Sequence, residues 1–168
     1  LIFLVILVVI SVREYSMYRN YRSTNETVRV LGNSYYAIYR MDFESATYDM
    51  IKGSDYMRQR IPAQGPYAFL MQTMGELMQP EVFEEFRNSF SIKNIRKLVA
   101  ARTRDYGGDF QRLFGDEYRW VNVRLLFDES LNPEEAVLCF KEVDAEKREQ
   151  LQHIELLKES LRTARKSE

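Results

Sequence analysis

The chain has a single cysteine, Cys139, and a single histidine, His153, among its 168 residues. One cysteine cannot form an internal disulfide, which suits a reducing compartment. A zinc site built from histidine and cysteine needs more ligands than the chain supplies. No Ser-His-Asp set and no phosphate-cradling loop is recognised either. The scarcity of these residues therefore excludes the common zinc and triad chemistries.

The chain also lacks an excess of charge of either sign. Its 24 lysines and arginines stand against 25 aspartates and glutamates, for a net charge of −1. No global field attracts nucleic acid or an acidic substrate, so we expect no nucleic-acid partner. Aromatic residues, in contrast, are plentiful: 11 tyrosines and 10 phenylalanines can supply large buried areas to a small core.

An unbroken apolar run opens the chain, from Leu1 to Ile10, and three arginines follow by residue 22. The run is shorter than the roughly 20 apolar residues that cross a bilayer, and arginines just past a membrane edge favour the cytoplasmic side. We therefore expect residues 1–12 to be the end of a transmembrane helix in the cell inner membrane, with residues 13–168 cytoplasmic. The alternatives are a buried core strand or a signal-peptide core. The latter should have positive charge before the run and small residues after it.

Residues 13–32 are predicted to form a helical connector that stops at Gly32-Asn33. The apolar period then changes to two. Alternation from Tyr35 to Phe43 places Ala37, Tyr39 and Met41 on one face of a strand, and residues 46–52 read as the returning strand of a hairpin.

The middle of the chain is predicted to be helical. Pro66 can begin one helix, Pro80 interrupts the pattern, and Ser91 is a fair N-cap for another helix. Three strands follow, over residues 106–114, 117–128 and 136–144, with Gly115-Asp116 as a tight turn between the first two. The expected class is α+β: a five-stranded antiparallel sheet with helices inserted after the first hairpin, flanked by N- and C-terminal helices.

Residues 145–168 are predicted to form a charged helix with an apolar seam. Ile154, Leu157, Leu161 and Ala164 recur at alternating intervals of three and four residues, the spacing of a coiled coil. We expect a homodimer through the flanking helices. The seam continues to the last residues without a cap, and the chain opens inside an apolar run, so we expect a piece of a longer protein, cut at both ends.

Several of these residues resemble the PAS domain. The stretch Gly115-Asp116-Glu117-Tyr118-Arg119-Trp120-Val121, the inferred strand order, and Glu142-Val143-Asp144 leading into a helix are similar to the PAS subtype with a Gly-x-Tyr-Arg-Trp-Val-like strand. The resemblance covers about residues 33–144. It places Asp144 where PAS domains often have the aspartate of an Asp-x-Thr motif that couples the last strand to the exit helix. Residue 146 is Glu here instead of Thr.

Three other features have a functional and a structural interpretation. Gly107-Gly108-Asp109-Phe110 is similar to the Gly-Gly-Asp/Glu-Glu-Phe signature of diguanylate cyclases, but it is one residue short, and paired glycines in a strand more often mark a bulge or a close backbone approach. His153 lacks the neighbouring motif of a kinase phosphoacceptor and reads as a solvent-facing helix residue. Cys139 lies mid-strand and reads as a small buried hydrophobe.

The resemblance implies a sensory or relay module of a membrane-anchored bacterial signalling protein, without catalysis in these residues. We expect it to pass a conformational signal to a downstream histidine kinase domain of a two-component system. The alternatives are a module of a diguanylate cyclase or phosphodiesterase protein, and a ligand-free dimerisation scaffold. A small-molecule ligand between sheet and helices is compatible with the resemblance. The ligand residues and the cofactor stay unknown, with none as one option, because a one-residue error in register swaps the two faces of every strand.

Overall fold

The computed structural model describes residues 32–166. The chain divides into a unit that ends at Tyr35 and a unit that starts at Tyr36. The second unit contains the elements β1 (Ala37–Asp42), β2 (Thr47–Lys52), α2 (Asp55–Arg60), β3 (Gln64–Pro66), α3 (Tyr67–Gly75), α4 (Pro80–Ser89), α5 (Ile92–Ala100), β4 (Asp105–Phe114), β5 (Glu117–Leu126), β6 (Glu135–Glu142) and α6 (Asp144–Lys166).

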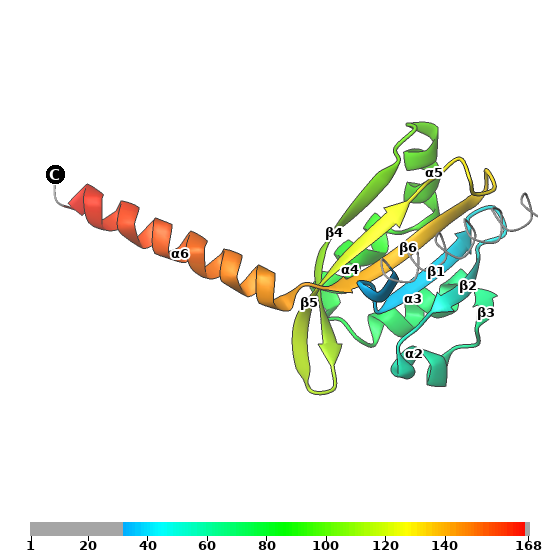
Figure 1. Cartoon of the computed structure of the whole chain (residues 1–168), viewed down its shortest axis with the longest axis horizontal. Helices are drawn as coiled ribbons and strands as arrows, with labels where there is room; N and C mark the ends of the chain where they lie inside the picture. Colours follow the sequence, from blue (N-terminus) through cyan, green and yellow to red (C-terminus); the bar gives the residue numbers. More distant parts are fainter. Residues whose placement is uncertain (1–31, 167–168) are drawn as a thin grey trace, which may run out of the picture. The chain divides into compact units, whose positions relative to one another are not determined.

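The strands form one antiparallel sheet in the order β3-β2-β1-β6-β5-β4 (Figure 1). The chain inserts α2 to α5 between the β1–β2 hairpin and β4, as the sequence predicted, and the α+β class is confirmed. The number of strands was predicted wrongly: the sheet has six strands, because β3 adds an edge strand beside β2. Its three residues are too few to show alternation, and Pro66 is tolerated at an edge, where its missing N–H costs no ladder bond.

One face of the sheet packs against the helices and forms the core. Ala37, Tyr39 and Met41 of β1 are all fully buried, which confirms the predicted face of this strand. Val121 and Val123 of β5 are buried on the same side. This face is called the inner face below, and the face away from the helices the outer face.

The ends of several elements have the predicted local causes. The hydroxyl of Ser91 accepts a hydrogen bond from the Asn94 amide and caps α5. Gly115 has a φ of 66° in the β4–β5 turn, a conformation that glycine adopts without steric cost. The short helix α2 was not predicted, although Ser54 caps it by accepting from the Met57 amide.

The predicted membrane segment 1–12 lies outside the described residues, and so does all of the connector 13–32 except Gly32. Within residues 32–166, no helix is both long enough and apolar enough to cross a membrane. The predicted exit helix begins at Asp144, one residue before the expected start.

Candidate functional site

Side chains fill the space between the inner face and the helices, where the resemblance to PAS domains would place a ligand. Phe86 of α4 and Phe90, the residue that caps its C-terminus, contact Phe110 of β4, with ring centroids 5.3 and 5.8 Å apart. The Phe86 ring lies 6.3 Å from that of Phe140 on β6. Leu70 and the four rings are between 0 and 4% exposed. The interior of this domain is therefore a packed aromatic core.

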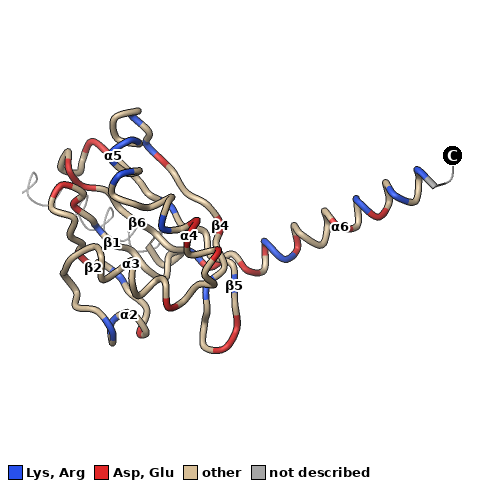
Figure 2. Tube along the Cα trace, turned by 180° about the vertical axis from the view of Figure 1, so that it is seen from behind, with Lys and Arg blue, Asp and Glu red and all other residues tan. Residues whose placement is uncertain are grey.

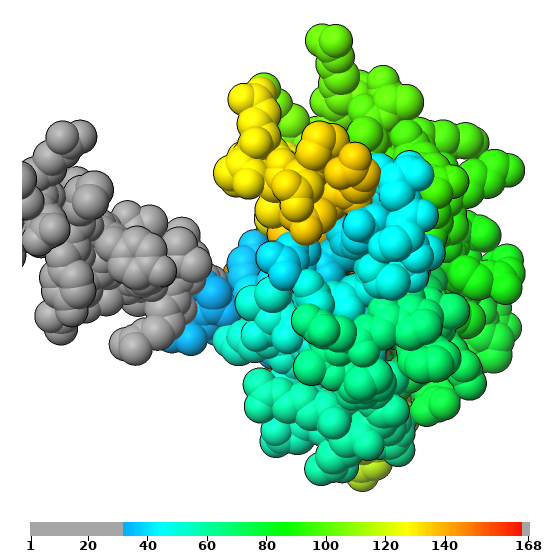
Figure 3. Space-filling view, turned by 90° about the vertical axis from the view of Figure 1, so that its right-hand side faces the viewer, coloured from blue at the N-terminus to red at the C-terminus, as the bar shows by residue number. Residues whose placement is uncertain are grey.

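An open groove lies at the end of the sheet away from α6. It has a volume of about 770 Å³, is open to solvent, and is lined by Arg102, Phe127 and Pro133 among others. Figure 3 looks onto this end, where the β1–β2 turn (cyan) and the β5–β6 loop (yellow to orange) lie side by side. A backbone hydrogen bond of 2.9 Å, from the Phe43 amide to the Glu134 carbonyl, joins the turn and the loop.

Polar groups enter the core at its edge near β4. Arg112 is 2% exposed, and its Nη1 donates to the Tyr36 hydroxyl at 2.9 Å. Its guanidinium also lies over the Phe114 ring, 4.6 Å from the centroid. Burial raises the pKa of Tyr36 to about 12, although the charge of Arg112 acts in the opposite direction. The hydroxyl of Tyr39 on β1 is also buried, without a hydrogen-bond partner among the residues described.

Asp144 joins the end of the sheet to the start of α6. Its carboxylate accepts a hydrogen bond of 3.0 Å from the backbone amide of Trp120 on β5 and one of 2.6 Å from Nε of Arg148. These two bonds lower the pKa of Asp144, the Trp120 amide having the larger effect. The Val143 amide also donates to the Trp120 carbonyl at 2.9 Å. The predicted coupling residue thus lies at the junction, and Arg148, one helical turn later, is the side chain that bonds to it.

Lys147 makes a second connection between α6 and the sheet. Its Nζ lies 2.8 Å from the carboxylate of Asp109 on β4, which also accepts from Asn122 of β5 at 2.7 Å. Partial burial acts to raise the pKa of Asp109, but the bonds from Asn122 and Lys147 outweigh it and lower that pKa. Lys147 also lies 5.2 Å from the ring centroid of Trp120, a distance suited to a cation–π contact.

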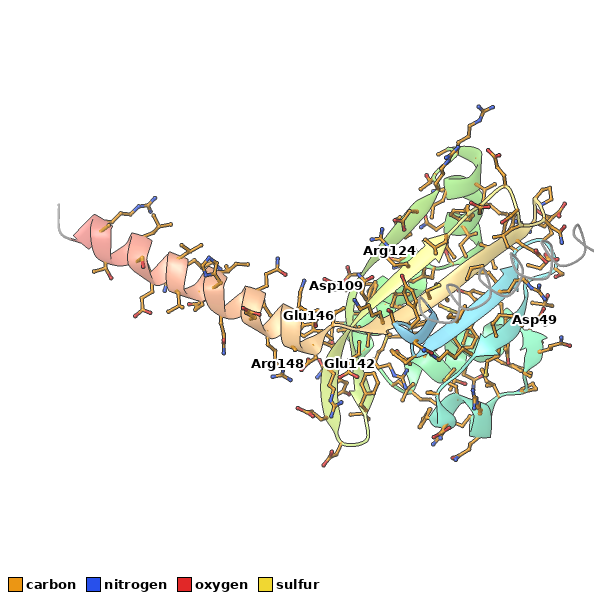
Figure 4. All side chains as sticks on the ribbon, in the orientation of Figure 1. Asp49, Asp109, Arg124, Glu142, Glu146 and Arg148 are labelled. Carbon is orange, nitrogen blue, oxygen red and sulfur yellow. The ribbon has the colours of Figure 1, made fainter. Side chains whose placement is uncertain are left out.

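Asp109, Glu142 and Arg148 lie close to the point where α6 leaves the sheet (Figure 4). Arg148 is 3.7 Å from Glu117, and Arg119 bridges Glu117 and Glu142 with nitrogen–oxygen distances of 3.2 Å to each. The sequence did not predict the roles of Lys147, Arg148 and Asp109. Their partners in the sheet or helix lie far away along the chain, or the residues look like part of an ordinary charged helix surface. We call this set the junction cluster: Asp109, Glu117, Trp120, Asn122, Asp144, Lys147 and Arg148.

Beyond its root, α6 is a helix whose side chains face solvent, with basic and acidic residues interspersed (Figure 2). In the predicted seam, Ile154 is 39% exposed, Leu157 53% and Leu161 65%, and Ala164 is exposed as well. Leu156, outside the seam, is 63% exposed. Large apolar side chains exposed at helical spacing are typical of a helix that has a partner.

The remaining sequence motifs have structural roles. Gly107 and Gly108 lie in β4, and a methyl group on Gly107 would collide with the Val123 carbonyl, so the close backbone approach is confirmed. His153 is exposed on α6, as predicted. Cys139 is buried, and burial raises the pKa of its thiol to about 11, which leaves it a protonated, unreactive group at neutral pH. No group of three metal-ligating side chains is found in the part of the chain that the structure describes.

A scan against models of protein families and a search of curated proteins found no match to the chain. Among solved structures, it is similar to a sensory box histidine kinase/response regulator from Burkholderia thailandensis, with 15% identity and a TM-score of 0.48 over 82% of this chain and 97% of that one.

It is also similar to the PAS domain of Bordetella pertussis BvgS, with 17% identity and a TM-score of 0.36 over 85% of this chain and 98% of that one. A third is the N-terminal domain of a diguanylate cyclase with PAS/PAC sensor from Marinobacter aquaeolei, with 13% identity and a TM-score of 0.42 over 66% and 97% of the two chains. Because these sequence identities and TM-scores are low, the description of the fold depends on the order and register of this chain's own strands.

Proposed function

We propose that residues 33–144 form a PAS module that relays a conformational signal to an output domain through α6. The observation that carries this proposal is the junction of Asp144, whose carboxylate holds the amide of Trp120 in the sheet and the side chain of Arg148 in the helix. A displacement of β5 is thereby passed to the first turn of α6. The same chain order of strands and helices that the PAS resemblance implies places this helix at the end of the sheet.

Relay without a resident ligand fits the packed core better than sensing of a large cofactor. Fully buried Tyr39, Phe86 and Phe140 occupy the space where a cofactor would lie, and interiors of such density have no room for one without rearrangement. The signal would then reach the module from the membrane segment expected over residues 1–12. Absorbance and mass spectrometry of the purified chain test this point. A stoichiometric co-purifying small molecule would favour a ligand sensor instead.

The proposal includes a homodimer at the inner membrane, with α6 paired along Ile154, Leu157, Leu161 and Ala164. Four exposed apolar side chains at this spacing need a second helix to be buried. We further propose a histidine kinase as the output domain, with a diguanylate cyclase as the competing output. A motif in the full-length protein discriminates them: a His-Asp/Glu-basic-x-Pro motif marks the kinase, and a complete Gly-Gly-Asp/Glu-Glu-Phe motif marks the cyclase.

The function is tested by the output activity of the full-length protein with Asp144→Ala. Loss of the junction bond is expected to change basal output several-fold and to weaken its response to the upstream signal. Asp128→Ala is the matched control, because Asp128 also accepts a backbone amide, that of Ser130 at 2.8 Å, but lies in the loop after β5, away from α6. Equal output from the wild type and both variants would refute the relay.

A further inference from the structure

Lys147 and Arg148, two consecutive basic residues near the start of α6, form ion pairs with residues on opposite faces of the sheet. Asp109, the partner of Lys147, is paired across the sheet with Asn122. Asn122 and Trp120 alternate with the buried Val121 and Val123 along β5, so Asp109, Asn122 and Trp120 belong to the outer face.

The partner of Arg148 belongs to the other side. Glu117 has the same parity along β5 as the buried Val121, which places its side chain on the inner face at the end of the strand. Arg148 lies 3.7 Å from Glu117. The two ion pairs therefore lie on opposite faces of the sheet, one at the middle of the β4–β5 pair and one at the first residue of β5.

Because of helix geometry, these two ion pairs can control the rotation of α6 about its own axis. Consecutive residues of an α-helix point about 100° apart around its axis, because a turn takes about 3.6 residues. A rotation of α6 that carries Lys147 away from Asp109 moves Arg148 toward the inner face, and the opposite rotation loosens Arg148 from Glu117.

The two pairs differ in strength. Lys147 and Asp109 are 2.8 Å apart, and their side chains are 23 and 30% exposed. Arg148 and Glu117 are 3.7 Å apart and are 55 and 56% exposed. Closer and less solvated pairs are less screened by water and salt, so the Lys147 side dominates in the resting position.

We propose that Lys147 and Arg148 are positioning residues that set the rotational position of α6, Lys147 from the outer face and Arg148 from the inner face. This inference rests on the proposed relay only for its consequence, the signal sent along α6. The clamp itself is a property of this one chain, and it operates in a monomer as well as in a dimer.

The test measures the position of α6 against the sheet within one chain. Spin labels are placed at Asp116 in the β4–β5 turn and at Gln152 on α6, with Cys139 replaced by alanine and the labelled chain diluted into unlabelled chain. Pulsed EPR distances are then compared for the wild type, Lys147→Gln and Arg148→Gln. The two variants are expected to shift the mean distance in opposite directions, each by on the order of 3–5 Å, less than a helix diameter, with the larger shift for Lys147→Gln.

Two further variants separate positioning from loss of fold. Asp109→Asn should reproduce the shift of Lys147→Gln, and Lys147→Arg, which keeps the charge, should restore the wild-type distance. Arg162→Gln, farther along α6, is the matched control and should leave the distance unchanged. Shifts of the same sign in both glutamine variants, or no shift in either, would overturn the clamp.

Fluorescence of Trp120, the only tryptophan of the chain, provides a second test that needs no spin labels. Lys147→Gln should raise the quenching of its fluorescence by acrylamide about twofold, because the lysine side chain covers the ring, whereas Arg148→Gln should not raise it. Equal quenching in the two variants would contradict the clamp. A moved α6 with unchanged output activity in the full-length protein would keep the clamp and refute the relay.

Discussion

At the scale of single residues, a few positions have roles that depend on a close backbone approach, a hydrogen bond or an ion pair. Gly107 is required by the approach of the Val123 carbonyl, and Asp144 accepts a hydrogen bond from the backbone amide of Trp120. The spacing of glycines and the PAS resemblance predicted both of these positions. The pairing of Lys147 with Asp109 could not be predicted, because 38 residues separate the two and only the folded sheet brings them together.

Substitution of the paired glycines separates a structural from a catalytic role. Gly107→Ala is expected to cost about 3 kcal/mol of unfolding free energy, because the new methyl meets backbone that cannot move, whereas Gly108→Ala should cost about 1 kcal/mol. A methyl on Gly108 meets the ring of Phe110 at 3.2 Å, and a side chain can shift. Urea unfolding followed by circular dichroism measures both; equal losses would contradict the close approach.

The hydrogen bonds and ion pairs of Asp144 and Asp109 in the junction cluster should be lost at acidic pH. The pKa values of Asp144 and Asp109 are both lowered in the folded chain. Their bonds therefore contribute stability that is fully present above the ordinary carboxyl pKa of about 4 and is lost as the pH falls through the lower folded values. Trp120 fluorescence should stay constant between about pH 5 and 8 and change below about pH 4. A transition centred between about pH 6 and 7 would point to a different titrating group.

At the scale of elements, apolar period and caps predicted most of the sheet and helices. The burial of Ala37, Tyr39 and Met41 and the cap at Ser91 follow directly from local sequence. β3 and α2 were missed since they are three and six residues long, too short for a periodic signal. The seam of α6 is a periodic pattern of the same kind, and its apolar side chains are exposed in the single chain.

The packing of α4 on the sheet depends on Phe86, whose ring is fully buried. Phe86→Ala should lower the free energy of unfolding by about 3–5 kcal/mol, through lost burial and a residual cavity. Phe69→Ala on α3 is the matched control, because Phe69 is 46% exposed, and its loss should cost about 0.5 kcal/mol. Denaturant unfolding of the two variants measures the difference, and comparable losses would show that the aromatic core is not packed as described.

At the scale of the whole molecule, the proposal is that two copies associate through α6. Leu157→Glu together with Leu161→Glu should shift the sedimentation of the chain from dimer to monomer, because two charges in a seam oppose burial. Leu156→Glu introduces one such charge at a leucine outside the seam, exposed to 63%, and should leave association unchanged. An unaltered dimer in the double variant, or an equal loss in Leu156→Glu, would contradict the seam.

The central claim is that the sheet holds α6 through Asp144, and amide hydrogen exchange of the wild type and Asp144→Ala tests it most directly. The amide of Trp120 and those of residues 143–148 are predicted to exchange faster in the variant, while Val123 and Leu125 in the buried part of β5 keep their rates; Asp128→Ala should leave all of them unchanged. Unchanged exchange at Trp120 and the root of α6, or a uniform rise across the whole sheet, would contradict the account.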